Sequence, residues 1–208
     1  MSTGQHADAE RIILTDLNAG ATLQEKNRIV GFWIFLAGEC ALFATLIGTY
    51  LGLVGQSMGG PTTHDVFDLV LVGIATVLLL SSSLTGVLSI IGMQRGDRRM
   101  MNFWIVFTLV LGAAFLAMQV FEFIHYYHEG LTFTSSAFGS AFYTLVGFHG
   151  GHVFFGLLWI TALFIQSLDK EIDRDNASKF YISGLYWHFV DVVWVIIFTV
   201  VYLMGKVG

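Results

Sequence analysis

The chain has 208 residues, of which 55% are hydrophobic and only 12% are charged, and its formal net charge is −5 at pH 7. A soluble domain carries about twice this charged fraction, so the composition excludes a water-soluble globular protein, and we expect no nucleic acid among its partners. The single cysteine, Cys40, excludes both a disulfide framework and a thiolate metal site.

Five apolar stretches are each long enough to cross a bilayer as a helix, because a span needs about 20 apolar residues. They cover about 29–54, 66–93, 103–127, 138–168 and 180–204. We therefore predict an all-α fold, a polytopic membrane bundle of five transmembrane helices forming one domain over 29–204. The polar residues 1–28 lack the basic-then-apolar order of a secretory signal, so we expect a cytoplasmic N-terminal segment, with 205–208 as an outer tail.

The basic residues predict the orientation of the bundle, because Lys and Arg collect on the cytoplasmic side of a membrane. Nine of the ten fall on the same side of the predicted spans, and only Lys206 falls on the other. The nine are Arg11, Lys26, Arg28, Arg95, Arg98, Arg99, Lys170, Arg174 and Lys179. We therefore expect the N-terminus inside and the C-terminus outside.

The first predicted span contains a single acid, Glu39, about ten residues or 15 Å from its inner end. Charges are expensive at that depth, so we expect its carboxyl to be protonated or hydrogen-bonded. The second span is almost wholly apolar, and its pair Ser82 and Gly86 is typical of close helix packing.

Polar side chains then gather in the third and fourth predicted spans. Gln119, Glu122 and His125 lie near the outer end of the third, with Glu122 and His125 three residues apart. His149 and His152 have the same spacing in the fourth, which places both on one helix face. By residue count, His152 lies about 24 Å from the inner end of its helix.

The fifth predicted span contains YWHFVDVVW, in which His188 and Asp191 are three residues apart and can meet on one face. Ionisable groups inside a membrane face protein and have partners, so the rest of the chain must supply a surface for this face. The fourth span adds Gly147 and Gly151, a GxxxG pair that favours close helix contact.

The residues alone leave several functions open. His125 and His149 lie at similar depths and could ligate a haem in a b-type cytochrome, or simply bond neighbouring helices. Glu39 and Asp191 could carry protons or an ion, or could be structural acids. An independent transporter usually has internal repeats and broken helices, whereas this chain shows no repeat and has one proline.

Four segments resemble subunit III of the haem–copper terminal oxidases. FYTLVGFHGGHVFFG (142–156) and LYWHFVDVVWVIIF (185–198) carry the resemblance most strongly. GFWIFLAGECALFATLIGTY (31–50) resembles the glutamate-bearing helix of that family, and LGAAFLAMQVFEFIHY (111–126) its Gln/Glu helix. The resemblance runs from about Asn27 to Gly208. The five-helix length is most similar to the bacterial cytochrome c oxidase form, with the quinol oxidase form as the alternative.

The resemblance implies a multi-pass accessory subunit in a bacterial cell membrane, with no catalytic centre, cofactor or metal of its own. Haem and copper are then expected in partner subunits I and II, with direct helix packing on subunit I. A small subunit IV and membrane phospholipids are further expected partners. Glu39 matches the family's buried carboxylate, which is linked there to the proton entrance of subunit I. The family's seven-helix form has a lipid-filled cleft between its first two helices and its last five. This chain matches from the third helix onward, so either the cleft does not carry over to this chain or another subunit completes it.

On this reading, structural, lipid-contact or proton-uptake roles are expected for a set of membrane-embedded polar residues. These are Glu39, Gln119, Glu122, His125, His149, His152, His188 and Asp191.

Overall fold

The computed structural model describes residues 23–54, 68–169 and 174–207, and within these ranges all regular secondary structure is helical. The five long helices are α2 (Leu23–Leu53), α4 (Leu69–Gln94), α5 (Arg98–His128), α6 (Ala137–Asp169) and α7 (Arg174–Ile197). A π-helical turn, η1 (Phe198–Leu203), and the short α8 (Met204–Val207) continue α7. All five long helices are long and apolar enough to span a membrane, which confirms the predicted all-α fold of five transmembrane helices.

Three helices begin earlier than the apolar stretches predicted. α2 begins at Leu23, α5 at Arg98 and α7 at Arg174, about five or six residues before each predicted span. Helical hydrogen bonding does not stop where apolar sequence stops, so a polar first turn extends each helix beyond the bilayer core. Residues 1–22 of the predicted N-terminal segment, with Arg11, Lys170 and Gly208, lie outside the described residues.

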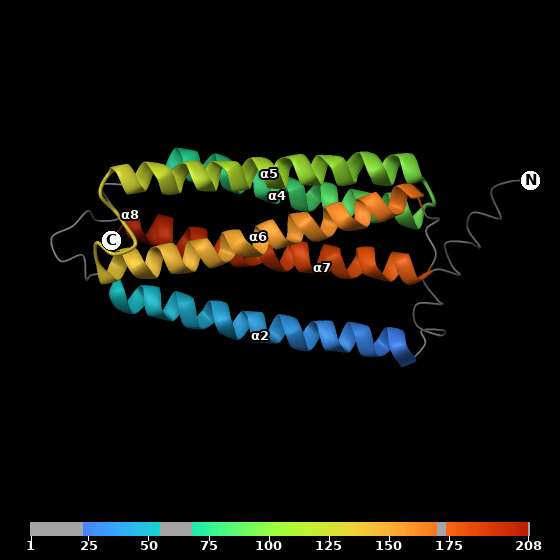
Figure 1. The fold of residues 1–208 in the computed structure, drawn as a ribbon, viewed down its shortest axis with the longest axis horizontal. Helices are drawn as coiled ribbons and strands as arrows, with labels where there is room; N and C mark the ends of the chain where they lie inside the picture. The colour runs from blue at the N-terminus through green and yellow to red at the C-terminus, as the bar shows by residue number, and fades with distance from the viewer. Residues whose placement is uncertain (1–22, 55–67, 170–173, 208) are drawn as a thin grey trace, which may run out of the picture.

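Helices α6 and α7 lie between α2 on one side and the α4–α5 pair on the other (Figure 1). The most apolar window of α7 is 44% buried, against 11% for α2, so α7 is the central helix and α2 a peripheral one. The α4–α5 pair is joined by a tight turn at Gly96, whose φ of 69° suits glycine. The helix that carries YWHFVDVVW is thus the one around which the others pack.

Trp187 of α7 fills the centre of the bundle and is only 2% exposed. A Cβ added to Gly112 of α5 would lie 2.9 Å from its ring, and one added to Gly156 of α6 would lie 3.0 Å from it. These two glycines allow α5 and α6 to approach the indole. The predicted GxxxG pair has no such role within the described bundle, because a Cβ on Gly151 would meet no atom within 4 Å.

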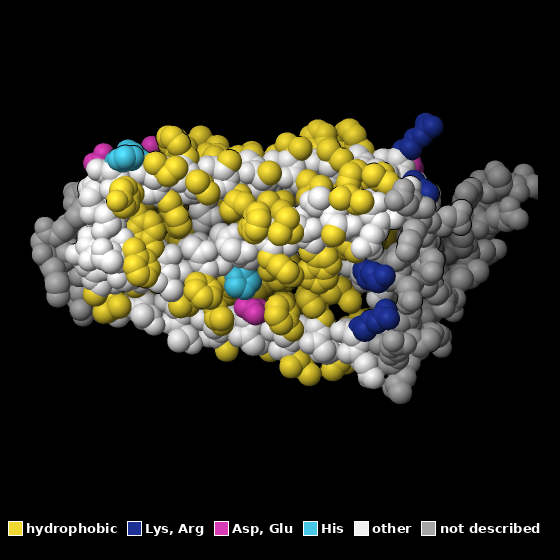
Figure 2. Space-filling view, in the orientation of Figure 1, with side chains coloured by type: hydrophobic (Ala, Val, Ile, Leu, Met, Phe, Trp, Pro, Cys, Tyr) yellow, Lys and Arg dark blue, Asp and Glu magenta, His cyan; other side chains and the backbone are white. Residues whose placement is uncertain are grey.

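One end of the bundle is basic. α2, α5 and α7 begin there and α4 ends there, which places Arg28, Arg95, Arg98, Arg99 and Lys179 together. On the face shown in Figure 2, Lys and Arg side chains occur only at this end, and the length of the bundle is largely apolar. We refer to it below as the basic end.

Candidate functional site

Glu39 of α2 and His152 of α6 form an ion pair or hydrogen bond across the two helices. His152 Nε2 lies 3.0 Å from Glu39 Oε2, and each side chain is 18% exposed. In Figure 2 a histidine and an acidic side chain lie against each other between α6 and α2, near the middle of the apolar surface. The pair is therefore at membrane depth, where an uncompensated charge is costly.

The depths predicted for these two residues differed by about 9 Å, yet the side chains meet. The structure explains the discrepancy by where the helices end. Glu39 is 16 residues from the start of α2 at Leu23, or about 24 Å. His152 is 17 residues from the end of α6 at Asp169, or about 26 Å. The two predicted depths differed because the count for Glu39 started at its apolar stretch, six residues inside α2, whereas the count for His152 started at the end of α6.

The hydrogen bonds of His152 limit how protons can be arranged in this pair. Its Nδ1 lies 2.7 Å from the carbonyl oxygen of Phe148, which can only accept, so Nδ1 carries a proton. Nε2 then faces Glu39 either as an acceptor from a carboxylic acid or as a donor to a carboxylate. In both arrangements the two side chains share one proton. Glu39 and His152 thus form one hydrogen-bonded unit rather than two independent polar groups.

His152 of this pair lines an apolar groove of about 410 Å³ on the bundle surface. Its walls include Phe35 of α2, Phe148 and Phe155 of α6, and Tyr186 of α7. The Phe43 ring packs edge-on against the His152 ring at 5.0 Å and covers the pair on the inner side. One side of the pair is therefore sealed by aromatic rings, and the other opens to whatever lies against this face.

A second polar seam joins α4 and α7. Trp187 Nε1 donates to Ser82 Oγ at 3.0 Å, and Trp194 Nε1 donates to Thr76 Oγ1 at 3.0 Å. Next to the Trp187–Ser82 bond, Ser83 Oγ pairs with His188 Nδ1. Trp187, His188 and Trp194 of α7 thus each meet a hydroxyl of α4, the helix whose sequence is almost wholly apolar.

Asp191 lies in the same seam and is 4% exposed. Within the described part of the chain, the Ser83 side chain faces its carboxyl, but neither carboxyl oxygen makes a well-formed hydrogen bond. His188, three residues away, pairs with Ser83 and not directly with Asp191. Residues three apart differ by about 60° around a helix axis, which leaves room for a side chain of α4 between them.

The polar residues at the outer end of α5 point in different directions. Glu122 is buried and accepts a hydrogen bond of 2.7 Å from the Tyr126 hydroxyl. The buried Gln119 donates to the carbonyl oxygen of Val146 at 3.0 Å, which ties α5 to α6. His125 is exposed on the helix surface. Glu122 and His125 therefore do not share a site.

His149 is fully buried and packs among aromatic rings. Its ring stacks on Trp194 at 5.0 Å, and Phe115 packs edge-on against it at 6.1 Å. A haem between His125 and His149 would need both to face one space, whereas His125 points outward and His149 inward. Among the described residues, no group of three or more His, Cys, Asp or Glu could hold a metal ion. The b-type cytochrome alternative therefore lacks a geometric basis.

Sequence reasoning missed the hydroxyl partners of these groups. Thr76 was not singled out, although a buried Trp N–H group requires an acceptor. Ser83 was not singled out either, although the run SSS (81–83) interrupts the apolar sequence of α4. Tyr126 was also missed, although it follows Glu122 by four residues, a spacing that brings side chains together on a helix.

The comparison with known proteins agrees with the four segments and the fold. The description "Cytochrome c oxidase subunit III" belongs to the family that matches residues 18–206. The chain belongs to this family. It is 55% identical to cytochrome c oxidase subunit 3 of Bacillus sp. (strain PS3), over 90% of this chain and 91% of the relative. It is 54% identical to the subunit of the same name from Bacillus subtilis (strain 168), over the same shares.

Quinol oxidase subunit 3 of Bacillus subtilis (strain 168) is a more distant relative, with 46% identity over 86% of this chain and 88% of that protein. The chain is therefore subunit III of a haem–copper oxidase and part of an oxidoreductase complex of several subunits. With its five spans it is a multi-pass membrane protein. These findings confirm the family predicted from the sequence.

Proposed function

We propose that this chain is the non-redox accessory subunit of a proton-pumping cytochrome c oxidase in a bacterial plasma membrane. In this role it packs on catalytic subunit I, stabilises it and sustains proton uptake while oxygen is reduced to water. Haem and copper belong to subunits I and II, and a small subunit IV and phospholipids complete its surroundings. The observation that carries the proposal is the Glu39–His152 pair, which shares one proton at the bundle surface.

The orientation proposed for the subunit places the basic end in the cytoplasm. Arg28, Arg95, Arg98, Arg99 and Lys179 gather at this end. Positively charged residues favour the cytoplasmic side, so the N-terminus would be inside and the C-terminus outside. Protons taken up by the oxidase come from the cytoplasmic side, so the proton entrance of subunit I would lie on the side of the basic end, with Glu39 about 24 Å from that end along α2.

The remaining polar residues are assigned structural roles in this proposal. Glu122 accepts a hydrogen bond from Tyr126 within α5, and Gln119 links α5 to α6. His149 packs among aromatic rings. His125 lies on the exposed side of α5, where a lipid or another subunit would contact it. None of these groups faces the Glu39–His152 groove as it is lined here.

Replacing Glu39 by Gln tests the proposal. The amide can still donate a hydrogen bond to His152 Nε2, but it cannot hold the shared proton. We expect the purified complex to start at the same rate of oxygen consumption and to lose activity severalfold sooner during turnover. Slower proton delivery would leave reactive intermediates longer at the oxygen site.

Glu122→Gln is the matched control, because it changes another buried carboxyl that keeps its donor, Tyr126. It should leave the endurance of the complex unchanged. If the Glu39→Gln complex stays active as long as the unmodified complex at every pH tested, Glu39 is structural and the role in proton uptake is refuted.

A quinol oxidase is the second candidate function, because the chain is 46% identical to quinol oxidase subunits. The 55% identity to cytochrome c oxidase subunits favours cytochrome c as the electron donor. The donor site lies on another chain, so the test is to supply each donor to the purified complex. Oxidation of quinol but not of cytochrome c would select the second candidate.

A further inference from the structure

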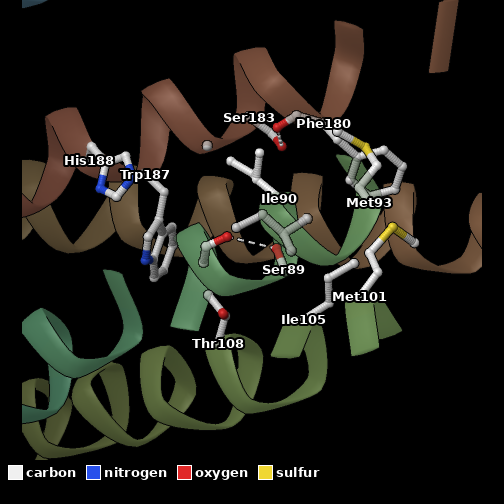
Figure 3. Close-up of a pocket in the computed structure, with 13 residues that line it drawn as sticks. Ser89, Ile90, Met93, Met101, Ile105, Thr108, Phe180, Ser183, Trp187 and His188 are labelled. Atoms are coloured by element: carbon white, nitrogen blue, oxygen red, sulfur yellow. Dashed lines mark hydrogen bonds between the residues drawn. The ribbon is translucent and has the colours of Figure 1, made fainter. Parts of the chain in front are cut away.

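A small cavity lies between α4, α5, α6 and α7, toward the basic end of the bundle. It measures about 30 Å³. Figure 3 shows its polar lining: Ser89 of α4, Thr108 of α5, and Ser183 and His188 of α7. The rest of the lining is apolar and includes Met93 and Met101 near the helix ends. The cavity thus places polar atoms from three helices around one space.

The volume and the lining suit ordered water. About 10–15 Å³ of this measure holds one molecule, provided that two to four polar partners surround it. Ser89 donates its hydroxyl proton to the Gly86 carbonyl at 2.7 Å, and Ser183 donates to the Phe180 carbonyl at 2.9 Å. Both hydroxyl oxygens therefore retain lone pairs that can accept from a water molecule. One or two waters would have the partners they need.

The next polar groups along α7 and α4 lead from this cavity to Asp191. His188 lines the cavity, and its Nδ1 pairs with Ser83 Oγ. Asp191 follows His188 by three residues on the same helix, and the Ser83 side chain also faces its carboxyl, although neither carboxyl oxygen makes a well-formed hydrogen bond among the described residues. A buried carboxyl that is poorly hydrogen-bonded is costly in its charged form, so a proton or a water must compensate it.

We propose that this cavity holds water and that, through His188 and Ser83, it connects Asp191 to the aqueous phase at the basic end as an exchangeable proton site. An imidazole and a hydroxyl can each accept one proton while releasing another, so the chain of groups can exchange a proton without leaving a charge behind. α4 carries no charged residue between Leu69 and Gln94, so His188 is the titratable neighbour of Asp191 in this seam.

This second site is separate from the Glu39–His152 pair and does not rest on the role proposed for Glu39. The pair lies between α2 and α6, whereas the cavity and Asp191 lie along the α4–α7 seam. A result at one site therefore leaves the other untouched.

Hydrogen–deuterium exchange in the intact oxidase complex, followed by infrared spectroscopy, tests the proposal. The carboxylic C=O band that disappears in Asp191→Asn identifies the Asp191 proton. We expect this band to shift after transfer of the unmodified complex to D₂O. Gly86→Ala should then slow the shift by about tenfold, as expected for loss of a bridging water. Gly86 lines the cavity, and a Cβ there would meet only Thr108, at 4.0 Å.

Gly73→Ala is the matched control on the same helix. A Cβ at Gly73 meets no atom within 4 Å, and Gly73 does not line the cavity. Its exchange rate should equal that of the unmodified complex. If Asp191→Asn does not assemble, Asp191→Glu keeps the carboxyl and should move the same band.

Two results would overturn the proposal. The first is that neither Asp191 variant alters any carboxylic band, which would mean that Asp191 holds no proton. The second is equal exchange rates in Gly86→Ala and the unmodified complex, which would mean that the cavity is not the route.

Discussion

The close contact between Gly112 and Trp187 gives a stability prediction whose size follows from the structure. In Gly112→Ala the new Cβ would lie 2.8 Å from a Leu157 methyl and 2.9 Å from two Trp187 ring atoms. Carbon atoms prefer a separation of about 3.5–4.0 Å, so at least one neighbour must move by roughly 0.6 Å or more. The leucine methyl can rotate away. The indole cannot, because Ser82 holds its N–H and Gly156 closes its other side.

Overpacking of a filled core costs about 1–3 kcal/mol. Alanine also favours a helix over glycine by about 0.8–1.0 kcal/mol, which would mask part of this cost. Gly73→Ala removes the ambiguity, because it makes the same change in a helix interior with no atom within 4 Å. The helix preference then cancels, and we expect Gly112→Ala to be less stable than Gly73→Ala by about 1–3 kcal/mol.

The assay is SDS titration of the purified chain in mixed micelles, with helix content followed by circular dichroism. The midpoint should fall for Gly112→Ala relative to Gly73→Ala. Equal midpoints, or a higher one for Gly112→Ala, would refute the view that the indole is fixed between α5 and α6.

Three further predictions concern hydrogen bonds at membrane depth. Trp187→Phe and Ser82→Ala should show a coupling free energy of about 0.6 kcal/mol in a double-mutant cycle by the same titration, and strictly additive effects would contradict the bond. Tyr126→Phe should destabilise the chain by about 1–3 kcal/mol, because Glu122 loses the hydroxyl that it accepts from; an unchanged midpoint would contradict this. His152→Gln should shorten the lifetime of activity during turnover as much as Glu39→Gln does, and the double variant should lose activity no faster than either single variant. Additive losses would show that the two residues do not act as a unit.

The five helices could be predicted because the hydrocarbon core of a bilayer offers backbone groups no water to bind. Every backbone polar group must be satisfied within its own segment, so an apolar run of about 20 residues has no other stable form. The first residues of the helices were predicted less accurately, since polar first turns extend α2, α5 and α7 beyond the apolar runs. Because α2 begins six residues before its apolar run, the count for Glu39 started about 9 Å further along the bundle than the count for His152, and the two residues were predicted at different heights.

The partners of the polar residues could not be predicted, because they depend on which helices are neighbours. A spacing of three residues puts His188 and Asp191 on one face, but it cannot show that Ser83 of α4 takes the His188 nitrogen. Glu39 and His152 are 113 residues apart, and no local pattern joins them. The family resemblance identified Glu39 as a functional candidate. Only the structure identifies its partner, His152, and indicates that the two side chains share one proton.

The two acid-containing seams differ in a way that bears on the proposed function. Glu39 sits on the peripheral helix α2 and pairs with His152, which lines a groove at the bundle surface, so in the proposed role a proton released from the pair would leave toward whatever covers that face. Asp191 sits on the central helix α7 and is 4% exposed, so in the second proposal it would exchange its proton through groups inside the bundle. A subunit without a redox centre can influence proton uptake in a neighbour only from its surface. For this reason the Glu39–His152 pair, and not Asp191, is the group that subunit I would sense during turnover.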